Sequence, residues 1–174
     1  MDDTLMGLTG STTTRPYDIA AVFLRLGLGV GLLSAVADRL GLWGPPGTPL
    51  VSWGNFHNFL LYTAKLNPWC PTACLQLLGV VVTISEAGLG MLLILGLWMR
   101  VAGLLNGILA LTFAAAMTFV LGVHAPLNYE VFVFSAASFL LATLKPDKLS
   151  LDAFRIWIPR KERRKKPARE LKRA

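Results

Sequence analysis

Four long apolar runs separated by more polar stretches set the pattern of this chain. They cover residues 17–37, 74–99, 101–123 and 127–144, and none shows the regular apolar–polar alternation that is typical of a strand. A helix that crosses a bilayer needs ~20 apolar residues, and in lipid it satisfies its own backbone hydrogen bonds. The pattern therefore predicts an all-α membrane protein, built as a four-transmembrane-helix bundle.

The stretch between the first two runs, residues 38–73, carries a second pattern. It opens with the turn-rich GLWGPPGTP and continues with SWGNFHNFLLYTAKLNPW, in which apolar residues from Phe56 to Thr63 recur at helical spacing and Ser52 is a candidate N-cap. We expect a short interfacial helix over the outer mouth of the bundle. It is either a lid on a ligand cavity or part of an aromatic belt at the membrane–water boundary, and we favour the belt.

The composition leaves no room for a large soluble domain. Hydrophobic residues make up 54% of the chain, and charged residues make up 16%, against about 25% in soluble domains. The net charge of +7 has one source, because residues 160–174 hold nine basic and two acidic residues. The other 159 residues hold eight of each and are neutral in sum.

The basic residues also predict the orientation in the membrane. In a four-span topology several of them share one side with the C-terminal tail, namely Arg15, Arg100, Lys145 and Lys148. The other side carries Arg39 and Lys65, so the positive-inside rule places both termini in the cytoplasm. The chain then divides into a cytoplasmic segment (1–16), a transmembrane domain (17–145) and a basic amphipathic cytoplasmic tail (146–174).

The tail is expected to act at the membrane surface. Each basic residue near anionic lipid contributes about 1 kcal/mol of attraction, and Leu151, Phe154 and Trp157 precede the basic run as an interfacial anchor. Binding of the lipid bilayer through residues 160–174 is the first interpretation, and docking of other membrane or cytoplasmic subunits is the second. A nucleic-acid partner is not expected, because the charge follows directly on a membrane anchor.

Two cysteines, Cys70 and Cys74, lie one helical turn apart in the segment CPTAC. This spacing differs from the CxxC of thiol oxidoreductases, yet it brings two thiols near the start of the second predicted span. Three states are compatible with it on the outer, oxidising side: a structural disulfide, two free thiols, or a redox-active pair.

Three charged residues, Asp38, Arg39 and Glu130, fall on the predicted outer face. His57 and His124 share that face, so it holds four side chains of metal-binding type if Arg39 is set aside. Their spacing matches no metal-site pattern, and we predict no metal site.

Glu86 is the one carboxylate inside the second apolar run. A charged group at a helix centre costs ~2.5–3.5 kcal/mol on insertion scales, so Glu86 must be buried in the bundle, paired or protonated. Arg25 in the first run is the expected partner. Counting 1.5 Å per residue from the ends of the two runs leaves the pair offset by about 8 Å, so contact requires a tilted or shifted first span. Asn106 in the third run is closer to Arg25 in depth.

Several segments, in this order and spacing, resemble the DoxX family of small bacterial and archaeal membrane proteins. They are LRLGLGVGLLSAVADRLGLWG, SEAGLGMLLILGLWMRVAGLLNG, NYEVFVFSAASFLLA and KPDKLSLDAF, and together they cover about residues 20–155. The resemblance implies a four-helix bundle in the bacterial cytoplasmic (inner) membrane. It also implies a link to redox chemistry, since relatives include the membrane subunit of a thiosulfate:quinone oxidoreductase and a component of a mycobacterial oxidative-stress complex. The family's polar residues carry over by position to Arg25, Glu86, Arg100 and Glu130.

Three functions are compatible with these features. The first is a membrane subunit of a quinone-linked oxidoreductase, with no intrinsic cofactor and with Arg25, Glu86 and Asn106 lining a polar pocket for a quinone head group or a proton relay. The second is a structural or assembly subunit of a larger membrane complex, in which the same three residues only hold helices together. The third is a small transporter or channel. The catalytic residues, if the chain has any, stay unknown at this point.

Overall fold

The computed structural model describes residues 16–145 and 149–153, and this part of the chain is helical without any strand. Its helices are α1 (Pro16–Arg39), α2 (Phe56–Leu66), α3 (Thr72–Leu95), α4 (Met99–Leu121), α5 (His124–Asn128) and α6 (Val131–Thr143). Residues 1–15 of the segment predicted to be cytoplasmic (1–16) and the basic run 160–174 lie outside the described residues, so the expectations for them stay predictions. The prediction of an all-α fold is confirmed for the described residues.

Three of these helices, α1, α3 and α4, are long and apolar enough to cross a membrane, which makes this a multi-pass membrane protein. The fourth predicted run, residues 127–144, is divided in the structure. Glu130 adopts a left-handed backbone conformation (φ 54°) between α5 and α6, and the apolar helix that follows has 13 residues. The shorter fourth element is therefore a finding that the apolar run alone did not predict.

The ends of α3 also differ from the predicted run 74–99. The helix stops at Leu95 because Gly96 is left-handed (φ 66°), a conformation that favours glycine. A side chain at Gly96 would in addition collide with Arg25 and Ser150. The turn between α3 and α4 is thus tight and closely covered.

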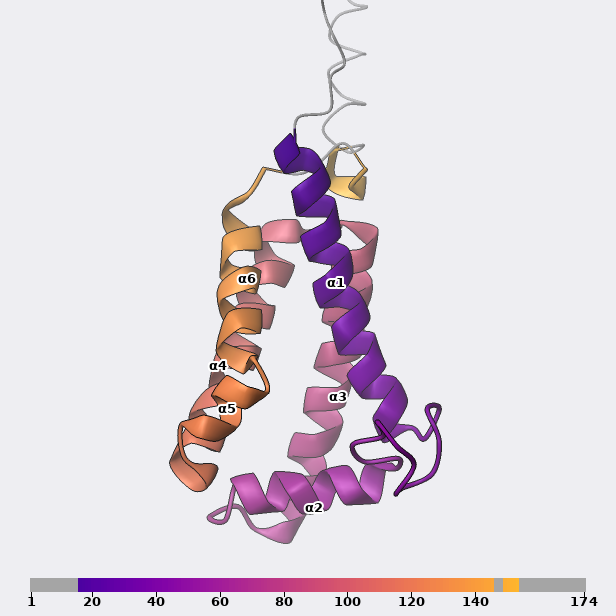
Figure 1. Cartoon of the computed structure of the whole chain (residues 1–174), viewed down its shortest axis with the longest axis vertical. Coiled ribbons are helices and arrows are strands. Elements are labelled where there is room, and N and C mark those ends of the chain that lie inside the picture. The colour runs from indigo at the N-terminus through magenta and orange to yellow at the C-terminus, as the bar shows by residue number, and fades with distance from the viewer. Residues whose placement is uncertain (1–15, 146–148, 154–174) are drawn as a thin grey trace, which may run out of the picture.

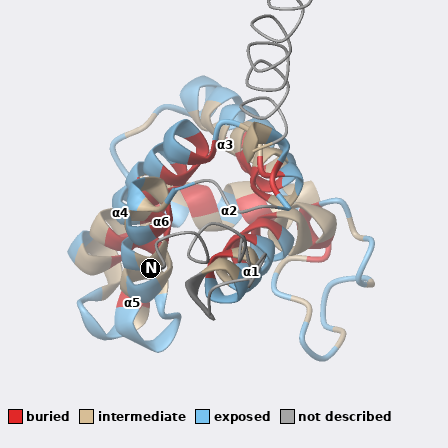
Figure 2. Ribbon diagram, turned by 90° about the horizontal axis from the view of Figure 1, so that it is seen from above, coloured by how far each residue is buried: buried red, intermediate tan, exposed pale blue. Residues whose placement is uncertain are grey.

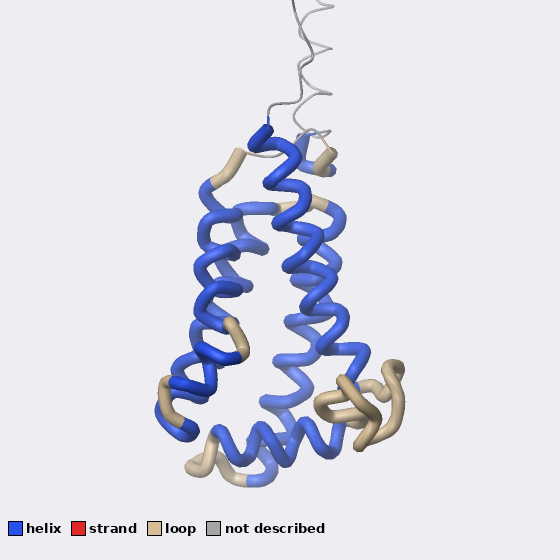
Figure 3. Tube along the Cα trace, in the orientation of Figure 1, coloured by secondary structure: helices blue, strands red, loops and turns tan. Residues whose placement is uncertain are grey.

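The helices pack as two pairs, with α1 against α3 and α4 against α6, while the contacts between the pairs are less extensive. Figures 1 and 3 show α2 lying across one end of the bundle, here called the α2 end. The other end, where α1 begins and residues 149–153 lie, is called the terminal end.

Small residues permit the close approach within each pair. A Cβ atom at Gly29 would lie 2.9 Å from the carbonyl oxygen of Gly90, and one at Gly103 would lie 2.9 Å from that of Ser138. Gly27 does not share this role, since a Cβ atom there would meet no described residue within 4 Å.

The apolar core fills the terminal half of the bundle. Its buried members come from four helices and are Leu28, Leu32, Leu89, Leu93, Met99, Ala102 and Leu141. Figure 2 shows buried residues on the inward faces of the helices and exposed ones outside. Many exposed side chains, such as Phe23 and Phe119, are large and apolar, as lipid-facing surfaces require.

A short segment, residues 149–153, closes the terminal end and is called the terminal clamp. The Asp152 carboxylate accepts hydrogen bonds from the backbone N–H groups of Trp98 (3.0 Å) and Met99 (2.9 Å), and the Asp152 amide donates to the Gly96 carbonyl (3.1 Å). The first N–H groups of a helix have no partner within the helix. Asp152 therefore caps α4 from a distant part of the chain.

Arg25 joins α1 to the same end. Its buried guanidinium donates to the carbonyl oxygens of Ile94 (2.8 Å) and Leu93 (3.3 Å) in the last turn of α3, and to that of Leu149 in the terminal clamp (3.2 Å). A cation is stabilised at the C-terminus of a helix, where the carbonyl groups point outward without partners. Arg25 thus connects α1 to the C-terminal end of α3 and to the terminal clamp.

We predict that replacing Asp152 with Ala lowers the free energy of unfolding by about 1 kcal/mol, because two N–H groups of α4 lose their acceptor. Thermal unfolding in detergent measures this. Asp152→Asn keeps one acceptor oxygen and should lose less, and Glu130→Ala, at an exposed position, serves as the control. Equal stability of Asp152→Ala and the control would contradict the capping role.

Candidate functional site

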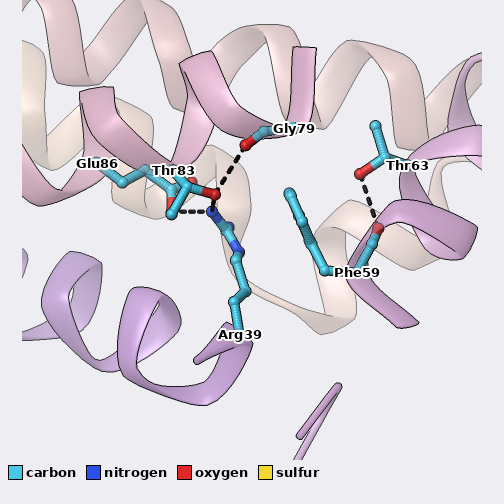
Figure 4. A network of polar contacts seen from close by, with 6 residues as sticks. All are labelled: Arg39, Phe59, Thr63, Gly79, Thr83 and Glu86. Carbon is cyan, nitrogen blue, oxygen red and sulfur yellow. Dashed lines mark hydrogen bonds and ion pairs between the residues drawn. The ribbon is translucent and has the colours of Figure 1, made fainter. Parts of the chain in front are cut away.

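A buried ion pair between Glu86 and Arg39 lies in the α2 half of the bundle. The Glu86 Oε2 atom is 2.7 Å from Arg39 Nη1, and the two side chains are 6% and 3% exposed. Figure 4 shows the Arg39 side chain extending from the end of α1 to the middle of α3. Glu86 is therefore both buried and paired, two of the states expected for a carboxylate in an apolar run. Its partner is Arg39, which was predicted to lie on the outer face.

The expected pairing of Glu86 with Arg25 is wrong. Arg25 contacts the last carbonyl groups of α3 at the terminal end, whereas Glu86 faces α1 near its other end. The depth count from the ends of the apolar runs already left a mismatch, and α3 ends four residues earlier than its run. Arg39 was expected at the surface because it follows the apolar stretch of the first run.

The loop after α1 turns back and buries the α1 end. The carboxylate of Asp38 accepts hydrogen bonds from the backbone N–H groups of Ser52 (3.0 Å), Trp53 (3.1 Å) and Gly54 (3.1 Å). Asp38 is thus a buried structural residue, and the folded loop covers its neighbour Arg39.

Aromatic rings from this loop and from α2 enclose the Arg39 guanidinium. Its Cζ atom is 3.8 Å from the centroid of the Phe59 ring and 5.2 Å from that of Trp53, within cation–π range. Nη1 also donates to Thr83 Oγ1 (3.2 Å) on α3. The cation therefore joins α1, α2 and α3, which fixes how α2 sits across the bundle.

The predicted interfacial helix is present as α2, but its N-cap is Asn55 and not Ser52. The Asn55 side chain accepts from the Asn58 amide at 2.8 Å. The backbone N–H of Ser52 instead donates a hydrogen bond to the Asp38 carboxylate.

A cavity of about 860 Å³ lies between the two helix pairs, with α2 across one side of it. This volume is in the range of small-molecule sites. Its polar wall includes Glu86, Arg39, Asn106 and Tyr62, and the rest is mainly apolar, with Phe113 among the lining side chains. The cavity exists because the core cluster fills only the terminal half of the bundle.

Asn106, on α4, is fully buried in this wall. Its Nδ2 donates to Ser138 Oγ (2.9 Å), and that hydroxyl donates to the carbonyl oxygen of Phe134 (2.7 Å). The Oδ1 atom of Asn106 is buried and has no hydrogen-bond partner within the described part of the chain. Of the three pocket residues predicted, the structure thus brings together Glu86 and Asn106 and leaves Arg25 outside.

Tyr62, which the sequence analysis did not select for the pocket, reaches the cavity from α2. Partial burial, and secondly the nearby Tyr129, raise the pKa of its phenol. Both effects favour the protonated hydroxyl, which can donate to a ligand. The helical spacing of the SWGNFHNFLLYTAKL segment was the signal that could have placed it there.

The two cysteines lie outside the cavity and are free thiols in the structure. A hydrogen bond with Cys74 is the main cause that raises the pKa of Cys70, with burial second. A raised pKa keeps the thiol protonated, which opposes nucleophilic reactivity. A redox role of this pair stays a prediction.

The remaining polar residues of the predicted outer face are dispersed. Glu130, His57 and His124 are exposed. Arg100, predicted to lie on the opposite side of the membrane, is also exposed, at the start of α4. Within the described residues, no group of three or more His, Cys, Asp or Glu side chains is placed to share a metal ion.

Comparisons with protein-family models, curated proteins and solved structures found no match to this chain.

We predict that Glu86→Gln destabilises the protein by ~3–5 kcal/mol, because it leaves the Arg39 guanidinium buried without its counter-charge. The free energy of unfolding in detergent checks this. Glu130→Gln is the matched control at an exposed position, and its effect should stay within about 0.5 kcal/mol. A Glu86→Gln variant as stable as the control would show that the ion pair does not contribute to the free energy of unfolding.

Proposed function

We propose that this protein is the membrane subunit of a quinone-linked redox system and that the cavity is its quinone-binding site. The observation that supports this is a cavity of about 860 Å³ in a multi-pass membrane protein. Its mainly apolar wall includes Asn106 and Arg39, whose Oδ1 and Nε atoms have no partner among the described residues. The resemblance to DoxX proteins points to the same chemistry.

The wall fits the two parts of such a ligand. A quinone carries a polar ring on an apolar tail, and Asn106, Tyr62 and the Arg39–Glu86 pair can meet the ring oxygens. Apolar side chains such as Leu32 and Phe113 can cover the ring faces and the start of the tail. A lipid-soluble ligand also reaches a cavity between membrane helices from the bilayer, without crossing water.

The chain's part in this proposal is binding and orientation. A bound quinone supplies the capacity to take up or release two electrons and two protons. The protein residues hold the ring, exclude water and set which oxygen faces Asn106. A further subunit exchanges electrons with the quinone, which is why we propose a subunit and not a complete oxidoreductase.

The proposal includes four membrane crossings in a bacterial cytoplasmic membrane, with both termini in the cytoplasm. Helix α6 alone is about 20 Å long, against ~30 Å of hydrocarbon. It packs along α4, and α5 precedes it at only a short interval, so α5 and α6 together complete the fourth crossing. The terminal end then faces the side with most of the basic residues.

An assembly role is the second candidate, and the terminal clamp favours it. The clamp, within the predicted tail 146–174, fixes the chain to the α3–α4 turn through Asp152 a few residues before the basic run 160–174. A tail attached at a fixed point can present its nine basic residues to a partner subunit or to anionic lipid.

The topology predicts the outcome of reporter fusions. A reporter inserted after Lys148 should lie in the cytoplasm, and one inserted within residues 44–51 should lie on the other side. Accessibility of the two reporters to an impermeant reagent measures this. Two reporters on one side would exclude the four-span arrangement.

Extraction of bound lipid from gently purified protein tests the ligand. We expect a quinone in near-stoichiometric amount with the unmodified protein. Ala110→Phe fills the cavity and should remove the quinone, whereas Leu111→Phe adds the same side chain at an exposed position of α4 and should retain it. Absence of quinone from the unmodified protein contradicts the proposal, and a co-purified partner without quinone supports the assembly role.

A further inference from the structure

The wall of the cavity includes a residue, Asn106, whose buried acceptor has no partner among the described residues and cannot be satisfied by a quinone. We propose that the cavity recognises its ligand through a hydroxyl hydrogen that the ligand donates to Asn106, so that hydroquinones bind in preference to the corresponding quinones. This inference rests on the proposed function and adds the redox form of the ligand to it.

The preference for a hydroxyl donor follows from the orientation of the Asn106 amide. Ser138 has a single hydroxyl hydrogen, and it is donated to the carbonyl oxygen of Phe134 at 2.7 Å. The Ser138 oxygen can then only accept, so the Nδ2 side of Asn106 must face it, at 2.9 Å. The opposite atom, Oδ1, is thereby fixed as an acceptor. It is buried, lacks a partner among residues 16–145 and 149–153, and belongs to a residue of the cavity wall.

The ion pair adds one donor to the same wall. Glu86 Oε2 is taken up by its 2.7 Å contact with Arg39 Nη1, whereas Arg39 Nε is a buried donor without a partner among the described residues. A quinone carbonyl can accept from such a donor but can give nothing to Asn106. A hydroquinone hydroxyl both accepts and donates, so it alone can satisfy both kinds of group.

An unpaired buried acceptor is costly, and a site built for a donor rejects an analogue that lacks one. A single neutral hydrogen bond of this kind corresponds to a preference of about tenfold in Kd. A water molecule that stays in the complex and donates to Asn106 would remove the preference and leave the two forms equal.

Three probes with the same ring and tail test the inference on the full chain in nanodiscs: decyl-hydroquinone, decyl-1,4-benzoquinone and the dimethyl ether of the hydroquinone. Equilibrium binding under anaerobic conditions gives the Kd values. We expect the hydroquinone to bind about tenfold more tightly than the quinone, and the dimethyl ether, which has no hydrogen to donate, to bind no better than the quinone.

Two variants assign the preference to Asn106. Asn106→Leu removes the acceptor and should bring the hydroquinone and quinone Kd values together. Ser138→Ala removes the partner that orients the amide, so the amide can turn its N–H toward the cavity, and quinone binding should improve. Thr112→Val, on the same helix at an exposed position, is the control and should keep the preference.

The results separate this inference from the proposed function. If no probe binds the unmodified protein, the proposed quinone site itself is wrong. If the probes bind but the quinone binds as well as the hydroquinone, the site stands and the inference fails. The comparison of probes on the unmodified protein decides this even where a variant fails to fold.

Discussion

The burial of Glu86 is the constraint on which the α2 half of the bundle depends. A carboxylate inside an apolar helix needs a cation, and the available one, Arg39, lies at the far end of α1. Bringing Arg39 inward requires the following loop to fold back, which Asp38 achieves by binding three backbone N–H groups. The same guanidinium then serves as the surface on which Phe59 of α2 packs. One ion pair thus positions α1, α2 and α3 together.

The two ends of the bundle are held by different interactions, and the cavity lies toward the end that is less densely filled. At the terminal end, Arg25 and Asp152 bind the unpaired backbone groups where α3 ends and α4 begins, and leucine side chains fill the space between the helices. Toward the α2 end, polar side chains replace this core, so the helix pairs stand apart. The polar wall that stabilises this half is therefore also the part of the protein able to meet a ligand.

Apolar runs were sufficient to predict the helices, because length and hydropathy decide which segments enter lipid. They did not predict the break at Glu130, which depends on a single left-handed residue, nor the end of α3 at Gly96. For the site, an unavoidable charge identified Glu86. Asn106 was selected because its depth matched that of Arg25, yet the structure places it with Glu86 in the cavity wall and leaves Arg25 outside. The partner Arg39 was missed, because its burial follows from a loop that returns over it and not from its position in the pattern. The capping by Asp152 is likewise a contact between segments 53 or more residues apart.

Two double-mutant cycles test most directly whether Arg39, and not Arg25, is the partner on which Glu86 depends. One combines Glu86→Gln with Arg39→Met, the other combines Glu86→Gln with Arg25→Met, and each is measured as the free energy of unfolding in detergent. We expect a coupling energy on the order of 2 kcal/mol in the first cycle and about 0.5 kcal/mol or less in the second, because only the first pair is in contact. A larger coupling in the Arg25 cycle would contradict the account.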